Sequence, residues 1–210
     1  MSFQATGVSG TIMSWSAYQF FMPIVGCICC VCVNLLADHV LFNGYSIVVR
    51  VLCDELAHWT SSAYVWAAAC STSPHRKYAL LAFLCGAFGC CIDADHFLLA
   101  DELAPKALTN LKRHPFFHIT TFTASANVLL YLLLRRTPYG YMTALAFSSW
   151  FPHQVRDANR HGFMLYPFRD TSPISQPFYL FLLTLAAPIA TFLLLQVVTE
   201  SQISTTLQIV

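Results

Sequence analysis

The feature that most constrains this sequence is a series of apolar runs, each about 20 residues long. A helix rises 1.5 Å per residue, so a run of about 20 residues crosses the roughly 30 Å hydrocarbon core of a bilayer. Only 10% of the 210 residues are charged, whereas soluble domains are typically about a quarter charged. The mean hydropathy is +0.58. The sequence therefore predicts an all-α, polytopic membrane helix bundle.

The runs predict about six transmembrane helices in a single domain over residues 17–198, with short polar tails at 1–16 and 199–210. Pro115 suits the first turn of the fourth helix, and Pro152 is expected to kink the fifth. The expected spans are 17–37, 47–70, 78–100, 115–134, about 140 into the stretch 150–168, and 176–198.

Charge and cysteine content exclude several classes of protein. The net charge of +1 gives no basic field for a nucleic-acid partner. The first charged residue is Asp38, so no basic n-region precedes the first span, which is expected to remain as an anchor. All nine cysteines lie at or before Cys91, mostly within spans, which argues against a disulfide framework. The lipid bilayer is the expected partner, and the sequence identifies no protein partner.

Polar residues gather in the stretch 150–168, WFPHQVRDANRHGFMLYPF. His153, Asp157 and His161 are spaced i, i+4 and i+8, so a helix would carry them on one face. Alternating topology brings further polar clusters to the same side of the membrane. These clusters are Asp38; Asp54 and His58; Asp93, Asp95 and His96; and His114 and His118.

An ionisable residue in a span costs roughly 2.5 to 3.5 kcal/mol on insertion scales and normally finds a partner inside the bundle. Two interpretations follow. In the first, ion pairs hold helices together, with Arg50 on Asp54 and with Arg156 or Arg160 on Asp157 or Asp93. In the second, carboxylates and imidazoles share a divalent cation such as zinc, for which these ligands are well suited. The concentration on one face favours a metal or proton-handling site.

Three segments resemble the signature blocks of the YdjM-like inner-membrane metal-dependent hydrolases: CIDADHFL at 91–98, RHPFFHIT at 113–120 and PHQVRDANRHGFMLYPF at 152–168. The ADH end of the first span, DADHFLLA, RDANRHG and PF-x-x-TSP are similar to the animal transmembrane protein 267 family. The resemblance covers about 38–173 and implies a membrane-embedded, metal-dependent hydrolase.

Carried over by position, the resemblance implies a set of metal or catalytic residues. The expected ligands are Asp95, His96, His118 and His153, with His58 as a further ligand. Asp93 and Asp157 are the expected catalytic base or supporting carboxylates. His114, His161 and Asp54 are secondary candidates. Arg113 stands where the family has its first histidine, and a guanidinium cannot ligate a cation. Ile92 replaces the family's proline.

The predicted reaction is metal-assisted hydrolysis of an amphiphilic or phosphate-bearing substrate. Arg113, Arg156 and Arg160 are expected to bind its anionic group. The alternatives are an inactive membrane adaptor or assembly protein that keeps a structural metal or polar cluster, and a proton or metal transporter. Spans two, three and five become apolar away from the cluster, which disfavours transport. The excess of basic residues on the cluster side predicts a cytoplasmic site.

Overall fold

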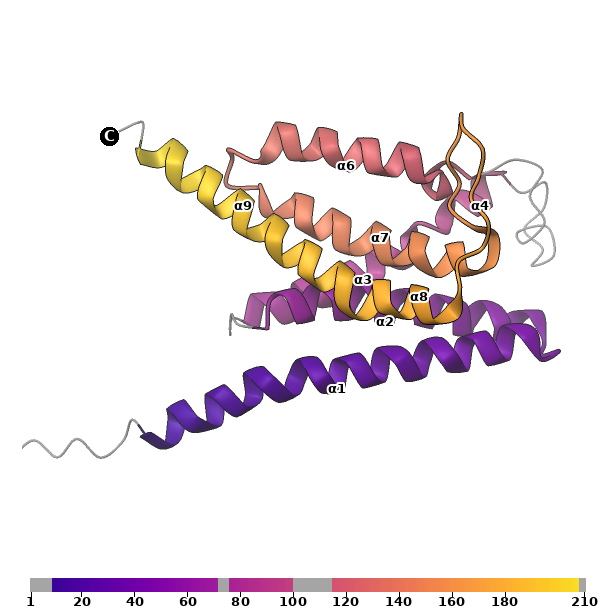
Figure 1. Cartoon of the computed structure of the whole chain (residues 1–210), viewed down its shortest axis with the longest axis horizontal. Helices are drawn as coiled ribbons and strands as arrows, with labels where there is room; N and C mark the ends of the chain where they lie inside the picture. The colour runs from indigo at the N-terminus through magenta and orange to yellow at the C-terminus, as the bar shows by residue number, and fades with distance from the viewer. Residues whose placement is uncertain (1–8, 72–75, 100–114, 208–210) are drawn as a thin grey trace, which may run out of the picture.

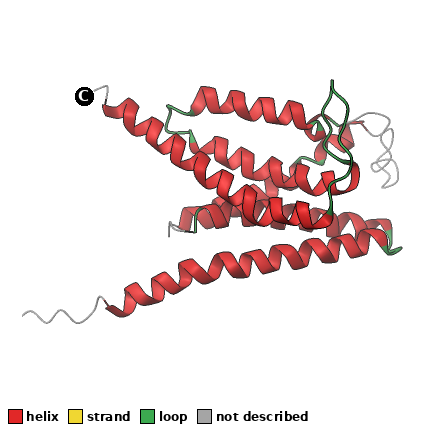
Figure 2. Ribbon diagram, in the orientation of Figure 1, coloured by secondary structure: helices red, strands yellow, loops and turns green. Residues whose placement is uncertain are grey.

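The computed structural model describes residues 9–71, 76–99 and 115–207. Over those ranges the regular structure is helical, with no β-strands, as Figure 2 shows. The predicted all-α membrane helix bundle is therefore confirmed. The helical elements are α1 (Ser9–Phe42), α2 (Ile47–Ala69), α3 (Arg76–Cys91), α4 (Ala94–Leu99), η1 (Phe116–His118), α6 (Thr120–Leu134), α7 (Tyr141–His161), α8 (Gln176–Phe181), η2 (Leu182–Ala186) and α9 (Ala187–Leu207).

Each predicted span corresponds to a helix or to a run of helical elements. Within the described residues, three segments are long and apolar enough to cross a membrane by length and composition, namely Phe21–Phe42, Tyr78–His96 and Gln176–Gln202, and α6 is a shorter apolar helix. The helices extend beyond the predicted domain at both ends, since α1 begins at Ser9 and α9 ends at Leu207.

The outside of the bundle is apolar and much of its inside is polar. Large hydrophobic side chains such as Leu36 and Leu133 are 61% and 65% exposed, while Asn34, His153 and Arg156 are buried. Water would penalise this arrangement, but hydrocarbon favours it, because lipid chains can cover apolar side chains while polar groups find partners inside. This distribution fits a multi-pass membrane protein.

Helices α2 and α7 form the centre of the bundle (Figure 1). Helix α2 packs against α1, α3, α7 and α9, and α7 also packs against α3, α6 and α9. Glycines allow α2 and α3 to approach closely. A Cβ on Gly86 would lie 2.6 Å from the indole nitrogen of Trp59, and one on Gly89 would lie 2.4 Å from Ser62 Oγ. Small residues commonly mediate such contacts between membrane helices.

Two predicted spans are interrupted where polar residues occur. The third does not run unbroken to Ala100: α3 ends at Cys91 and a turn at 92–93 separates it from α4. The fourth does not begin as an α-helix at Pro115, because Pro115 is extended (φ −63°, ψ 142°) and precedes the 3-10 turn η1. Irregular backbone can orient side chains in directions that a straight helix does not allow.

Two of the prolines within helices, Pro152 and Pro188, lie in the spans that pack at the centre of the bundle. Helix α7 continues through Pro152 to His161. In the last span a π-helical turn, η2, comes immediately before Ala187 and Pro188. Pro188 has no N–H to donate to the carbonyl of Thr184, four residues earlier. The hydroxyl of Tyr64 on α2 donates to that carbonyl instead, at 2.9 Å, so a side chain from another helix satisfies the backbone acceptor.

Candidate metal centre

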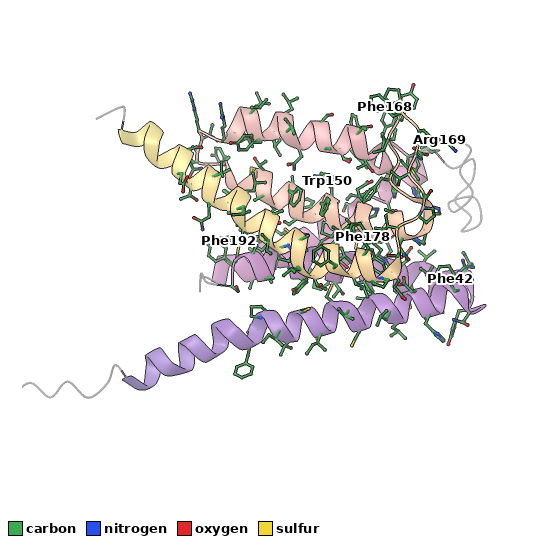
Figure 3. All side chains as sticks on the ribbon, viewed as in Figure 1. Phe42, Trp150, Phe168, Arg169, Phe178 and Phe192 are labelled. Atoms are coloured by element: carbon green, nitrogen blue, oxygen red, sulfur yellow. The ribbon has the colours of Figure 1, made fainter. Side chains whose placement is uncertain are left out.

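The polar cluster lies at one end of the bundle, where elements distant in sequence meet. The end of α1, the first half of α2, the α3–α4 junction, η1 and the end of α7 all contribute to it. In Figure 3, Phe42 at the end of α1 and Phe168 and Arg169 on the loop after α7 mark this end. A bridge between Ile119 and Met164 holds that loop against the start of α6.

Four side chains form the centre of the cluster. The Nε2 atoms of His118 and His153 lie 3.1 Å apart. Asp93 Oδ1 is 3.0 Å from His118 Nε2 and 3.7 Å from His153 Nε2. Asp157 Oδ2 is 3.4 Å and 3.2 Å from the same two nitrogens. Two imidazole nitrogens and two carboxylate oxygens therefore converge from η1, α7 and the α3–α4 turn.

The backbone of α3 defines the tautomer of His153. Its Nδ1 lies 2.9 Å from the carbonyl oxygen of Gly89. A carbonyl only accepts hydrogen bonds, so Nδ1 must carry the proton, and in the neutral ring Nε2 presents a lone pair to the cluster. The close approach of α2 and α3 at Gly89 thus also positions a histidine of α7.

Asp95 faces Nδ1 of His118, as the Gly89 carbonyl faces Nδ1 of His153. Its Oδ1 lies 3.4 Å from His118 Nδ1, and its Oδ2 accepts the backbone N–H of Phe117 at 2.7 Å. A carboxylate facing Nδ1 favours a proton there and leaves Nε2 as the ligating atom. Asp95 therefore lies behind His118 rather than in the centre, whereas Asp93, expected as a base, lies among the ligand atoms.

At the centre of the cluster, hydrogen-bond acceptors outnumber hydrogen-bond donors. Burial alone would lower the pKa of His118, but hydrogen bonds with Asp157, Asp93 and Asp95 outweigh it and raise that pKa well above its ordinary value. The cluster thus attracts positive charge. A tetrahedral zinc ion with bonds of about 2.0 to 2.1 Å keeps its ligand atoms about 3.3 Å apart, and the separations of 3.0 to 3.7 Å fit this arrangement.

Two further histidines border the centre. The ring of His58 stacks on that of His153, with centroids 3.9 Å apart, and its Nε2 lies 3.6 Å from Asp157 Oδ1. The ring of His96 lies 4.7 Å from that of His118, with Nε2 3.8 Å from Asp93 Oδ1. In the part of the chain that the structure describes, three sets could each hold a metal ion: His58, Asp93 and His153; Asp93, His96 and His118; and His118, His153 and Asp157.

The arginines of α7 bind the protein's own carboxylates. Arg156 is buried and contacts Asn34, Asp38 and Asp54 at 2.8 to 3.2 Å. Arg160 bonds to Asp54 at 2.6 Å and also to Asp157. Internal carboxylates engage both guanidinium groups, and the binding of a substrate anion by Arg156 and Arg160 stays a prediction. Asp54 joins these arginines instead of lying among the central ligands.

Sequence reasoning missed three residues that hold the cluster in place. Asn34 on α1 accepts from Arg156 and donates to Ser61 at 2.9 Å. Tyr179 on α8 donates to Asp38. Gln154 donates to the carbonyl of Phe117 at 2.6 Å and accepts from Thr120 at 2.8 Å. An amide within an apolar span, as at Asn34, is a signal that could have been used.

Among the described residues, the predicted candidate His161 does not join the centre. His161 is exposed at the last turn of α7, and none of the three potential metal-binding sets includes it. Arg113 and His114 lie outside the residues that the structure describes.

The fold and the cluster define an all-α, multi-pass membrane protein with buried histidines and aspartates at one end of its bundle. The chain is similar to transmembrane protein 267 of Xenopus laevis, with 32% identity over 143 residues, or 66% of this chain and 65% of the frog protein. It is 30% identical to the Bos taurus protein over 64% of this chain and 63% of the relative, and 28% identical to the Danio rerio protein over 80% and 79%. These similarities support the transmembrane protein 267 family.

The match spans slightly less than two thirds of the frog and bovine relatives. No family model matches the chain, and no solved structure matches it.

Proposed function

We propose that the chain is a transmembrane protein 267 family member that binds a divalent cation, with zinc as the best candidate, and acts as a membrane-embedded, metal-dependent hydrolase. The observation that carries the proposal is the convergence of His118 Nε2 and His153 Nε2 with the carboxylates of Asp93 and Asp157. The proposed relationship to YdjM-like hydrolases rests on the three sequence blocks alone.

The residues around the centre fit a cation. Imidazole and carboxylate are suitable zinc ligands, and each central histidine has an acceptor behind it, the Gly89 carbonyl for His153 and Asp95 for His118. Such outer contacts orient ligating histidines and increase their basicity. Arg160 orients Asp157, because it bonds to Oδ1 and leaves Oδ2 directed at the two histidines.

When bound, a divalent cation supplies an activated water and polarises a phosphoryl or carbonyl group. Asp93 is the better proton acceptor for that water, since its side chain is 19% exposed and that of Asp157 is 13%. With the cation held by His118, His153, Asp93 and Asp157, attack of the water oxygen on phosphorus or carbonyl carbon would break the ester bond, and the proton taken up by Asp93 would pass to the departing alcohol. His96, 28% exposed, marks the open side of the cluster.

The proposed substrate is amphiphilic or phosphate-bearing. Phe116, Tyr166 and Phe168 are 63%, 68% and 72% exposed on η1 and the loop after α7, and aromatic side chains favour the interface between lipid and water. A substrate with an apolar tail could therefore lie beside the cluster. Because Arg156 and Arg160 are engaged internally, the cation would contact the anionic group. The positive-inside rule supports a cytoplasmic site.

A second candidate function is a non-catalytic adaptor or assembly protein. The observation that favours it is the buried network of Arg156 with Asn34, Asp38 and Asp54, which joins α1, α2 and α7. Such a network stabilises helix packing without any reaction.

Metal analysis of the full chain in detergent tests the proposal. We expect bound zinc in the wild type, loss of it in His118→Ala and His153→Ala, and retention in His161→Ala, the matched control. The purified protein is then given short-chain phospholipids and p-nitrophenyl phosphodiesters. Hydrolysis that disappears with the metal supports the enzyme. Metal without turnover favours the adaptor, and a wild type without metal contradicts the proposal.

A further inference from the structure

The cluster contains more ligand atoms than one zinc ion needs, and they are arranged in two pairs. One pair is His58 and His153, from α2 and α7, and the other is His96 and His118, from α4 and η1. We infer that the cluster binds two divalent cations, one at each histidine pair, with Asp93 and Asp157 shared between them. This inference rests on the proposed function and specifies the metal content of the same site.

The first pair has nearly parallel rings. The imidazoles of His58 and His153 are inclined by 22°, with centroids 3.9 Å apart. The ring of His58 is buried and its Nδ1 has no hydrogen-bond partner among the described residues, while its Nε2 points toward the carboxylates. The distances from this Nε2 to Asp157 Oδ1 and Asp54 Oδ1, 3.6 Å and 3.8 Å, are too long for hydrogen bonds, and a cation at Nε2 would give the buried ring a partner.

The second pair lies across the carboxylates from the first. His96 and His118 have ring centroids 4.7 Å apart and an inclination of 36°. Both Nε2 atoms approach Asp93 Oδ1, at 3.8 Å for His96 and 3.0 Å for His118. This pair borders the more exposed side of the cluster, so its cation would be the one that solvent and substrate reach.

The carboxylates of Asp93 and Asp157 lie close enough to both histidine pairs to ligate both cations. Asp93 belongs to both the His58–His153 set and the His96–His118 set. Asp157 directs Oδ2 at His153 and His118 and Oδ1 at His58. Two histidines and two shared carboxylates would give each cation four protein ligands, the usual number for zinc. Hydrolases with two metal ions commonly keep them about 3.5 to 4 Å apart.

The charge of the region is consistent with two cations. The connected carboxylates are Asp38, Asp54, Asp93, Asp95 and Asp157, and the guanidinium groups bonded to them are those of Arg156 and Arg160. The carboxylates exceed the guanidinium groups by three. One divalent cation would leave a net charge of −1 in this largely buried region and two would leave +1, so the excess of carboxylates is large enough to accommodate a second cation.

Zinc stoichiometry of the full chain in detergent tests the inference. We expect two zinc ions per chain in the wild type and one each in His58→Ala and His96→Ala. His161→Ala is the matched control and should retain two. One zinc per wild-type chain would overturn the two-cation inference and leave the proposed function standing, whereas zero would overturn both.

A second measurement avoids dependence on variants that fold poorly. The wild type is loaded with Mn²⁺ alone and its paramagnetic resonance spectrum is recorded at two equivalents per chain. Two ions that share carboxylates should give an exchange-coupled multiline spectrum, lost in His58→Gln. A spectrum made only of the six lines of isolated Mn²⁺ would contradict the inference.

Discussion

His118 and His153 are 35 residues apart in sequence and face each other through Nε2 atoms 3.1 Å apart. An acceptor behind each ring, Asp95 or the carbonyl of Gly89, places a proton on Nδ1. At this separation the two Nε2 atoms need positive charge between them, either the proton that the raised pKa of His118 retains or a bound cation. This pair of residues is therefore the most direct structural indication of a cation site.

The carboxylate behind His118 should tune cation affinity without being a ligand. Asp95→Asn keeps the shape of the side chain but weakens its ability to orient and polarise the ring. We expect zinc affinity to fall about 10- to 100-fold, the usual effect of such outer contacts, with unchanged stoichiometry at saturation. Competition with a fluorescent chelator measures this. Asp170→Asn, on the exposed loop, is the control, and equal affinities would contradict the assignment.

Removal of Arg156 should destabilise the bundle strongly. The Arg156→Met variant would leave Asp38 and Asp54 without their shared buried partner, and breaking a buried ion pair costs about 3 to 5 kcal/mol. Thermal unfolding in detergent should show the loss, and Arg156→Lys should recover little of it because one ammonium cannot reproduce the planar set of contacts. Arg169→Met, at an exposed position, should unfold like the wild type.

The bond between Tyr64 and Thr184 should depend on Pro188. The Tyr64→Phe variant removes the hydroxyl that satisfies the Thr184 carbonyl, at a cost of about 1 kcal/mol in the free energy of unfolding. In a Pro188→Ala background the restored backbone N–H can reach that carbonyl, so the same change should cost less. A double-mutant cycle measures the coupling, and additive effects would show that the two residues are independent.

Cation binding should weaken as the pH falls, because protons compete for the same imidazole nitrogens. The raised pKa of His118 means that this ring keeps its proton through the neutral range until a cation displaces it. With one proton released per cation, the apparent affinity should rise about tenfold per pH unit as the pH increases. Titrations at pH 6, 7 and 8 check the slope, and a pH-independent affinity would exclude His118 as a ligand.

The sequence was sufficient to predict the bundle and the four central residues of the cluster, but not Asn34, Gln154 and Tyr179. Apolar runs of bilayer length predict helices regardless of their packing partners, and alternation across the membrane places their polar ends on one side. The structure accordingly brings Asp93, His118, His153 and Asp157 together. The cluster forms only in the tertiary structure, but the alternating topology alone predicted that these four residues would lie on the same side of the membrane.

The roles within the cluster were harder to predict. Asp93 and Asp95 are two residues apart, and only the turn at 92–93 and the position of η1 decide which carboxylate faces the centre. Likewise, the arginines of α7 were expected to contact substrate. Arg160 also pairs with Asp157, as the ion-pair interpretation of the sequence allowed. The other partners of these arginines lie on α1 and α2, more than 100 residues earlier, and no local pattern reveals those pairings.

The long-range contacts of Arg156 also have a consequence for synthesis at the ribosome. Asp38 and Asp54 are translated more than 100 residues before Arg156, and Tyr179, which donates to Asp38, follows later still. The first two helices must therefore enter the membrane with their carboxylates protonated, hydrated or held by the insertion machinery. Arg156 can neutralise these carboxylates only after helix α7 has emerged from the ribosome. Assembly of the polar end is therefore a late event in biogenesis.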